Sequence, residues 1–145
     1  MEQYIKTIEL RWSDLDPNFH LRHSAYYDFG AYARIAYLEE HGLSTKLMQE
    51  LKFGPILFRE ECIFRREMRL GDNLTISVEM VKAKPDFSRW SIRHQFMKNG
   101  QPAAMLTVDG AWMNTELRKL AALPEQARPV FEGMPRAENF EWIVK

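Results

Sequence analysis

Arg11-Trp-Ser-Asp-Leu-Asp-Pro-Asn-Phe-His-Leu-Arg-His-Ser-Ala-Tyr-Tyr-Asp28 is the most informative part of this chain. A strand pattern precedes it and a long helical pattern follows it, so residues 14–23 are expected to form a loop. The loop carries two carboxylates and two imidazoles, and it leads into the N-terminal end of the helix. Unpaired backbone N–H groups and partial positive charge at that end favour an oxygen that gains negative charge during a reaction.

The segment after the loop has the signals of an amphipathic helix. Ser24 is the expected N-cap, Asp28 in the first turn suits the helix dipole, and Gly42 is the expected C-terminal cap. Apolar and small residues recur at helical spacing, namely Tyr26, Phe29, Ala33, Ala36 and Tyr37. Small residues such as Gly30 would let a sheet approach the helix closely. A second, short helix or an irregular stretch is expected over residues 44–51.

The other regular segments read mainly as strands. Apolar periodicity predicts strands over residues 4–12, 55–68, 74–80, 90–96 and 104–112. The turn signals between them are Gly71-Asp72, Pro85-Asp86 and Asn99-Gly100. We expect a short helix over residues 124–132 and assign no structure to residues 134–145. One early helix among antiparallel strands predicts an α+β fold, with the sheet on one face of the helix and a partner subunit or ligand on the other.

Composition narrows the class of protein. The 145 residues are 46% apolar and 28% charged, as expected of one folded domain spanning residues 1–145. A formal net charge of zero lacks the electrostatic footprint of a general nucleic-acid binder. Cys62 is the only cysteine, so neither an internal disulfide nor a thiolate zinc cluster can form. With no apolar signal core and no run of membrane-spanning length, the expected location is cytoplasmic, without membrane partners.

The motifs together resemble a known family. Trp12-Ser-Asp-Leu-Asp-Pro followed by His20-Leu-Arg-His-Ser-Ala-Tyr-Tyr27 is similar to the opening motif of the 4-hydroxybenzoyl-CoA thioesterase family of hotdog-fold acyl-CoA thioesterases. Gly71-Asp72-Asn-Leu, the Asn99-Gly100 hairpin and Leu123-Pro124 match later family features in the same order. The resemblance covers roughly residues 5–130.

This resemblance implies a fold, an activity and an assembly. The fold is the hotdog, an α+β fold in which an antiparallel sheet of about five strands wraps around one long central helix. The activity is hydrolysis of an acyl-CoA, or of an acyl carrier protein thioester, without a metal or other cofactor. The assembly is a homodimer or a homotetramer, with active sites between subunits.

The catalytic residues follow from the same resemblance. Asp16 stands at the family's catalytic carboxylate, as nucleophile or as general base. The backbone N–H of His23 stands where the family polarises the thioester carbonyl. Phe19 replaces a common Gly, and Arg22-His23 replaces a common Asn-Asn. These departures bear on loop geometry and acyl-pocket shape more than on the reaction.

Substrate-binding residues are weighed against simpler roles. Lys82, Lys84 and Arg89 flank the Pro85-Asp86 turn, near where the family holds the CoA phosphates, although they could equally be solvated charges at a strand edge. Aromatic residues could line the acyl pocket or simply belong to the core, and the candidates are Tyr26, Phe29 and Trp90.

Other readings of the loop stay open. Asp14 and Asp16 could merely cap turns. Asp14, Asp16, His20 and His23 could hold zinc or iron, although their spacing matches no strong metal motif. The run from Asp14 to His20 also superficially resembles the Asp-x-Asn-Pro-x-His motif of hotdog enoyl-CoA hydratases, with spacing off by one residue. A non-catalytic hotdog module that binds an acyl thioester is the rival from a different class.

Overall fold

The computed structural model describes residues 2–144. A short 3-10 turn, η1 (Trp12–Asp14), lies in the loop before the first helix. The helices are α1 (Ala25–Glu40), α2 (Thr45–Leu51) and α3 (Arg128–Glu132). The strands are β1 (Tyr4–Ile8), β2 (Phe53–Phe64), β3 (Leu74–Ala83), β4 (Arg89–Lys98), β5 (Gln101–Asn114), β6 (Lys119–Leu120) and β7 (Arg136–Trp142).

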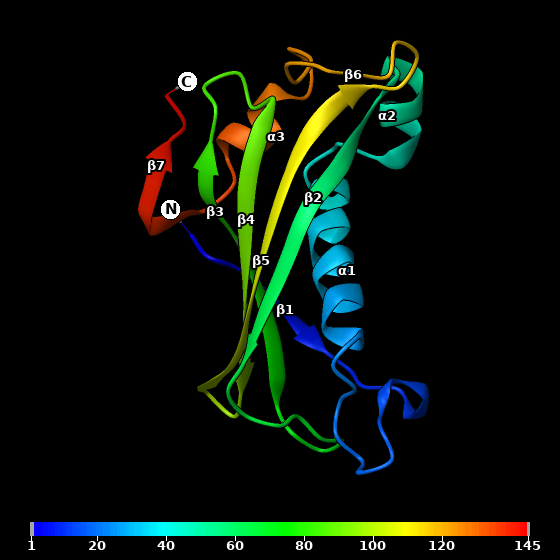
Figure 1. Ribbon diagram of the computed structural model, residues 1–145, viewed down its shortest axis with the longest axis vertical. Helices are drawn as coiled ribbons and strands as arrows, with labels where there is room; N and C mark the ends of the chain where they lie inside the picture. The colour runs from blue at the N-terminus through cyan, green and yellow to red at the C-terminus, as the bar shows by residue number, and fades with distance from the viewer. Residues whose placement is uncertain (1, 145) are drawn as a thin grey trace.

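One curled sheet contains all of these strands. Its main path runs β1-β3-β4-β5-β2 with antiparallel neighbours, while β6 pairs with β5, and β7 runs parallel to β3. Figure 1 shows α1 packed lengthwise beside the curved sheet. This arrangement confirms the predicted hotdog fold, an α+β fold with a sheet wrapped around one long helix.

The sheet extends beyond the predicted strands in two places. β6 has only two residues, too few for an alternating pattern, and β7 lies in the tail to which no structure was assigned. β1 covers the Leu74–Val78 half of the outer edge of β3, and β7 covers part of the other half from Met80 to Ala83. The edge of β3 is therefore shared between two short strands.

Close contact between α1 and the sheet depends on small residues, as predicted. A methyl group built on Gly30 would lie 2.4 Å from the Leu106 side chain, and Ala33 is completely buried. The far side of the core comes from the C-terminal segment, where the Phe131 ring lies 5.2 Å from the Trp112 ring. No helix within residues 2–144 is long and apolar enough to span a membrane.

The ends of several elements differ from the predictions. Ser24 stands at the predicted N-cap position of α1, but its backbone is helical and its hydroxyl accepts a hydrogen bond from Arg22 Nε (3.1 Å) instead of capping a backbone N–H. Gly42 does follow the end of α1, with a φ of +92° that glycine tolerates. β1 ends at Ile8, short of the predicted residue 12, because the chain turns into η1. β2 begins at Phe53 and ends at Phe64, four residues before its predicted end.

Candidate active site

Asp14 holds the loop before α1 in place. Its carboxylate is buried and accepts hydrogen bonds from Arg11 Nη2 (2.8 Å) and from the Arg11 backbone N–H (2.8 Å). Arg22 Nη1 lies 3.8 Å from the same carboxylate. The hydrogen bond from the Arg11 side chain holds the pKa of Asp14 below its ordinary value. Asp14 therefore has the structural role that the sequence left open for it.

Asp16 is held differently, by one oxygen only. Its Oδ1 accepts the backbone N–H groups of Asn18 (2.9 Å) and His20 (3.1 Å), which closes a tight turn. Its Oδ2 has no hydrogen-bond partner in the described chain. The turn therefore orients the carboxylate while leaving one oxygen free for chemistry.

A cavity of about 270 Å³ brings the predicted catalytic groups together. Its walls, which come from the loop, the start of α1 and the end of β2, are formed by Asp16, His20, Leu21, His23, Tyr26, Phe64, Arg65, Arg66 and Glu67. The His23 backbone N–H, just before α1, has no acceptor among residues 2–144. Burial raises the pKa of Tyr26 to about 12, so its hydroxyl stays protonated near neutral pH. We call this space the Asp16 cavity.

Residues at the end of β2 and just after it complete this cavity, and no local pattern predicts them there. The Phe64 ring lies 4.9 Å from the Tyr26 ring, and Arg65 and Arg66 follow along the wall. His20 Nε2 lies 3.0 Å from both Glu67 Oε2 and Arg69 Nη2, which ties the loop to this segment. The sequence pattern does not place these residues at the loop, because the strand pairing that brings them there is not local.

The four candidate metal ligands do not form a centre. Asp14 is bonded to Arg11, and His20 faces Glu67 and Arg69. Within residues 2–144, no three His, Cys, Asp or Glu side chains gather as a metal-binding group. The loop therefore offers a carboxylate and backbone donors rather than a ligand cage.

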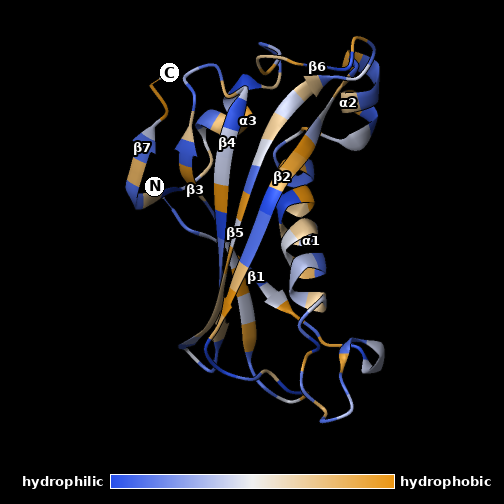
Figure 2. Cartoon of the chain, viewed as in Figure 1, coloured by the Kyte–Doolittle hydropathy of each residue, from blue (hydrophilic) through white to orange (hydrophobic). Residues whose placement is uncertain are grey.

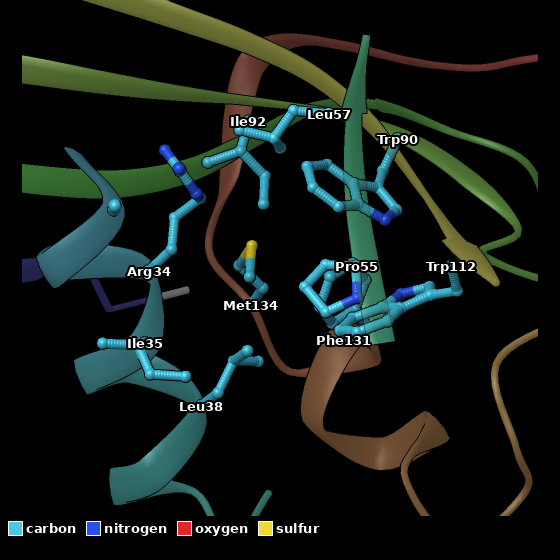
Figure 3. Close-up of a pocket in the computed structure, with 11 residues that line it drawn as sticks. Arg34, Ile35, Leu38, Pro55, Leu57, Trp90, Ile92, Trp112, Phe131 and Met134 are labelled. Carbon is cyan, nitrogen blue, oxygen red and sulfur yellow. The ribbon is translucent and has the colours of Figure 1, made fainter. Parts of the chain in front are cut away.

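The three predicted acyl-pocket residues lie in three different cavities. Tyr26 lines the Asp16 cavity. Phe29 lines a surface hollow with Arg11 and Asp14. Trp90 lines a third cavity of about 290 Å³ between α1 and the sheet, which we call the Arg34 cavity. Its walls, seen in Figure 3, are Ala31, Arg34, Ile35, Leu38, Pro55, Leu57, Trp90, Ile92, Trp112, Phe131 and Met134.

The predicted phosphate-binding residues lie far from Asp16 within one chain. Lys82 is near the end of β3, Lys84 is in the β3–β4 turn, and Arg89 begins β4. Figure 1 shows this turn at the opposite end of the sheet from the loop before α1. The Arg89 guanidinium instead lies 5.0 Å from the Phe58 ring on β2. Their role in binding CoA stays a prediction.

Comparisons with known proteins agree with this fold. A family described as the thioesterase-like superfamily matches residues 10–131. A Staphylococcus aureus hypothetical protein, solved in complex with CoA, superposes with a TM-score of 0.83 at 21% identity, covering 99% of this chain and 89% of that one. A Thermus thermophilus thioesterase complexed with coenzyme A and Zn gives a TM-score of 0.72 at 26% identity, covering 89% and 97% of the two chains.

A third solved structure is that of a 1,4-dihydroxy-2-naphthoyl-CoA thioesterase from Synechocystis. It superposes with a TM-score of 0.80 at 16% identity, over 91% of this chain and 97% of that one. At this identity the likeness concerns the fold alone. A search of curated proteins found no significant match.

Proposed function

The chain belongs to the thioesterase-like superfamily, and from that membership we propose that it hydrolyses an acyl-CoA thioester to a free acid and CoA. One observation carries the proposal: Asp16 and His23 line the same cavity at the start of α1, and within residues 2–144 neither Asp16 Oδ2 nor the His23 N–H has a hydrogen-bond partner. The fold likeness to two proteins solved with CoA supports the choice of CoA thioesters.

The reaction needs few groups, because a thioester already has a good leaving group. The carbonyl oxygen accepts the His23 N–H, and each such donor to the developing oxyanion contributes about 3 kcal/mol. Asp16 Oδ2 either attacks the carbonyl carbon or removes a proton from a water that attacks it. The C–S bond breaks, the CoA thiolate leaves and gains a proton, and water supplies the new oxygen of the acid.

The edge of the sheet supports a homodimer as the active form. β2 pairs with β5 on one side only, and its other edge has no partner strand in the part of the chain that the structure describes. Large apolar residues on β2 remain exposed at both ends of a polar middle (Figure 2), namely Leu57, Phe58, Ile63 and Phe64. A long apolar edge strand invites pairing with another strand. We propose that the β2 edges of two copies pair, and that two dimers can form a tetramer.

Antiparallel pairing of β2 would also bring the distant basic residues to the site. It sets the Phe58 end of one strand beside the Phe64 end of the other. Phe64 lines the Asp16 cavity, and Arg89 lies over Phe58. Arg89 of a second copy, with Lys82 and Lys84 behind it, would then approach Arg65 and Arg66 and bind CoA phosphates there.

The test measures thiol release from short, medium, long and aromatic acyl-CoA substrates. Asp16→Asn keeps an amide oxygen for the turn but removes the carboxylate, so kcat/KM should fall about 100-fold or more with the oligomer intact. Asp28→Asn is the matched control, because the Asp28 side chain is 71% exposed and does not line the Asp16 cavity.

Each other outcome has a definite meaning. Unchanged turnover in Asp16→Asn removes Asp16 from the mechanism. If the wild type hydrolyses no acyl-CoA but does hydrolyse acyl carrier protein thioesters, the reaction stands and the substrate's carrier is the protein rather than CoA. CoA binding with no hydrolysis of either substrate type identifies a non-catalytic binding module.

A further inference from the structure

The Arg34 cavity holds one charge among apolar walls. Arg34 is its only ionisable lining residue, and its side chain extends from α1 toward the strands (Figure 3). Trp90 and Trp112 also line the cavity, but their indole N–H groups are buried and have no acceptor in the described chain. The Arg34 guanidinium is therefore the polar side-chain group that this cavity offers to a ligand, and none of the lining residues carries a side-chain oxygen.

The partner of Arg34 does not neutralise its charge. Arg34 Nη1 lies 3.0 Å from His94 Nε2, and His94 Nδ1 lies 2.8 Å from the carbonyl oxygen of Ser77. Because a carbonyl only accepts, Nδ1 carries the proton and Nε2 accepts from Arg34. Burial lowers the pKa of His94 to about 3, so this imidazole is neutral at pH 7.

No carboxylate compensates the guanidinium at close range. Within residues 2–144, Arg34 forms no ion pair shorter than 4.0 Å. Glu60 on β2 acts on it only at longer distance, and burial, the larger effect, lowers the pKa of Arg34. A partly desolvated cation without a close counter-ion is unfavourable, so the site is suited to an anion that arrives with a ligand.

The guanidinium lines the Arg34 cavity and extends along α1 toward the end that carries Tyr26. A methyl group built on Gly30 would be 3.3 Å from Arg34 Nη1, so the side chain reaches back along α1 to the level of Gly30. Tyr26, one turn closer to the loop, lines the Asp16 cavity. Residues four apart share a helix face at about 6 Å spacing, so an acyl chain held at Asp16 and passing Tyr26 would meet Arg34 next.

We propose that Arg34 binds a carboxylate at the far end of the acyl group, so that the substrate is a thioester of a dicarboxylic acid. This inference rests on the proposed thioesterase function. The planar guanidinium has N–H groups left after its bond to His94, and its fork matches a carboxylate. The neutral His94 holds the fork in orientation without cancelling its charge.

The experiment compares acyl-CoA pairs of equal length, adipoyl-CoA with hexanoyl-CoA and suberoyl-CoA with octanoyl-CoA. The readout is the ratio of the two kcat/KM values within each pair. The wild type should favour the dicarboxylic member of at least one pair by about 100-fold, because the plain chain leaves Arg34 unpaired. Arg34→Met keeps length and apolar packing but should bring that ratio close to one. Arg34→Lys keeps the charge without the fork and should give an intermediate ratio.

Glu60→Gln is the control for a role of Arg34 in an internal ion pair, and it should keep the wild-type ratio. A wild type without preference in either pair overturns the proposal. Two results for Arg34→Met also overturn it. Equal loss of activity on both members of a pair would make Arg34 a structural residue. Dissociation of the oligomer in light scattering would make it an interface residue.

A binding measurement separates this proposal from the thioesterase proposal. Free adipate and suberate should raise the melting temperature of the wild type more than hexanoate and octanoate do, and Arg34→Met should abolish the difference. This result in a protein that hydrolyses no thioester would refute the proposed reaction and retain the carboxylate site. Equal shifts for all four acids in such a protein would refute the carboxylate site as well.

Discussion

The Asp16 cavity and the Arg34 cavity share two walls, α1 and β2, yet their polar groups are held in opposite ways. Asp16 is anchored by backbone N–H groups two and four residues away, and one of its oxygens stays free. Arg34 is anchored by His94, sixty positions away, and its charge lacks a close carboxylate within residues 2–144. Local bonds orient the Asp16 carboxylate near the surface, whereas long-range packing holds the Arg34 cation between helix and sheet.

The largest expected effect concerns the strand that both cavities share. Ile63→Lys places a charge on the free edge of β2, where Ile63 is 43% exposed. The variant should lose the oligomer, and thioester hydrolysis should fall to background if each site needs both copies. Light scattering and thiol release measure the two effects.

Leu117→Lys is the matched control for that substitution, because Leu117 is 67% exposed and lies away from the edge of β2. It should keep both the oligomer and the activity. A monomeric Ile63→Lys variant with full activity would show that one chain contains the whole site and would remove β2 pairing from the proposal.

The next effect is the pH dependence of stability that comes from His94, the residue that holds Arg34 in place. His94 has an ordinary pKa of 6.5 and a pKa of about 3 in the folded protein. The unfolded chain therefore binds the extra proton between these values, so stability is full above pH 6.5 and falls as the pH drops toward 3. The loss is about 1.4 kcal/mol per pH unit, or roughly 2–3 kcal/mol by pH 4.5.

Urea unfolding between pH 7 and pH 4.5 measures this slope. His94→Gln should flatten it, whatever the variant's stability at pH 7, whereas substitution of the exposed His23 side chain by Gln should leave it unchanged. Equal slopes in the wild type and His94→Gln would mean that His94 is not held neutral by burial.

The difference between the cavities also explains which parts the sequence could predict. Asp16, His23 and Tyr26 lie within eleven consecutive positions, so one local motif contains them all. The contact between Arg34 and His94 depends on how α1 lies across β4, and neither residue belongs to a motif. A bulge between Leu57 and Arg59 also changes which residues of β2 face α1, and alternation alone did not reveal it.

The main strands, their turns and the long helix were predictable because each has its own period or turn residues. The tail was not predictable by the same means. β7 has the sequence Arg-Ala-Glu-Asn-Phe-Glu-Trp, which lacks a clean apolar face, and it forms because the upper edge of β3 is open to it. Tertiary context decided that strand, and it also decided the ends of β1 and β2.

A smaller effect tests the close packing of α1 on the sheet. Gly30→Ala introduces a methyl group 2.4 Å from Leu106, so the helix or the sheet must shift. The free energy of unfolding should fall by about 1–3 kcal/mol. Gly54→Ala on β2 is the control, because its new methyl would meet only Thr115 at 3.7 Å, an ordinary contact. Equal stability of the two variants would show that α1 can move away from β5 at little cost.

The smallest effect separates the two aspartates of the loop. Asp14→Asn weakens the bonds from Arg11, and the loss of stability should be modest because the Arg11 side chain is 72% exposed and screened by water and salt. The pKa of Asp14 is lowered below 3.8 in the folded protein, so its contribution is present above that pH and disappears as the pH falls through the lowered value. Unfolding curves of the wild type and Asp14→Asn should therefore differ at pH 7 and converge at low pH.

Asp16→Asn should behave the other way in the same measurements. Its amide oxygen can still accept the N–H groups of Asn18 and His20, so the turn and the free energy of unfolding should be kept while activity is lost. The contrary result is an Asp16→Asn variant that is as destabilised as Asp14→Asn and loses turnover only in proportion to its folded fraction. Both aspartates would then have a structural role in the loop. The Asp14 carboxylate accepts hydrogen bonds through both oxygens, and the Asp16 carboxylate through one. That difference would then have no bearing on the chemistry.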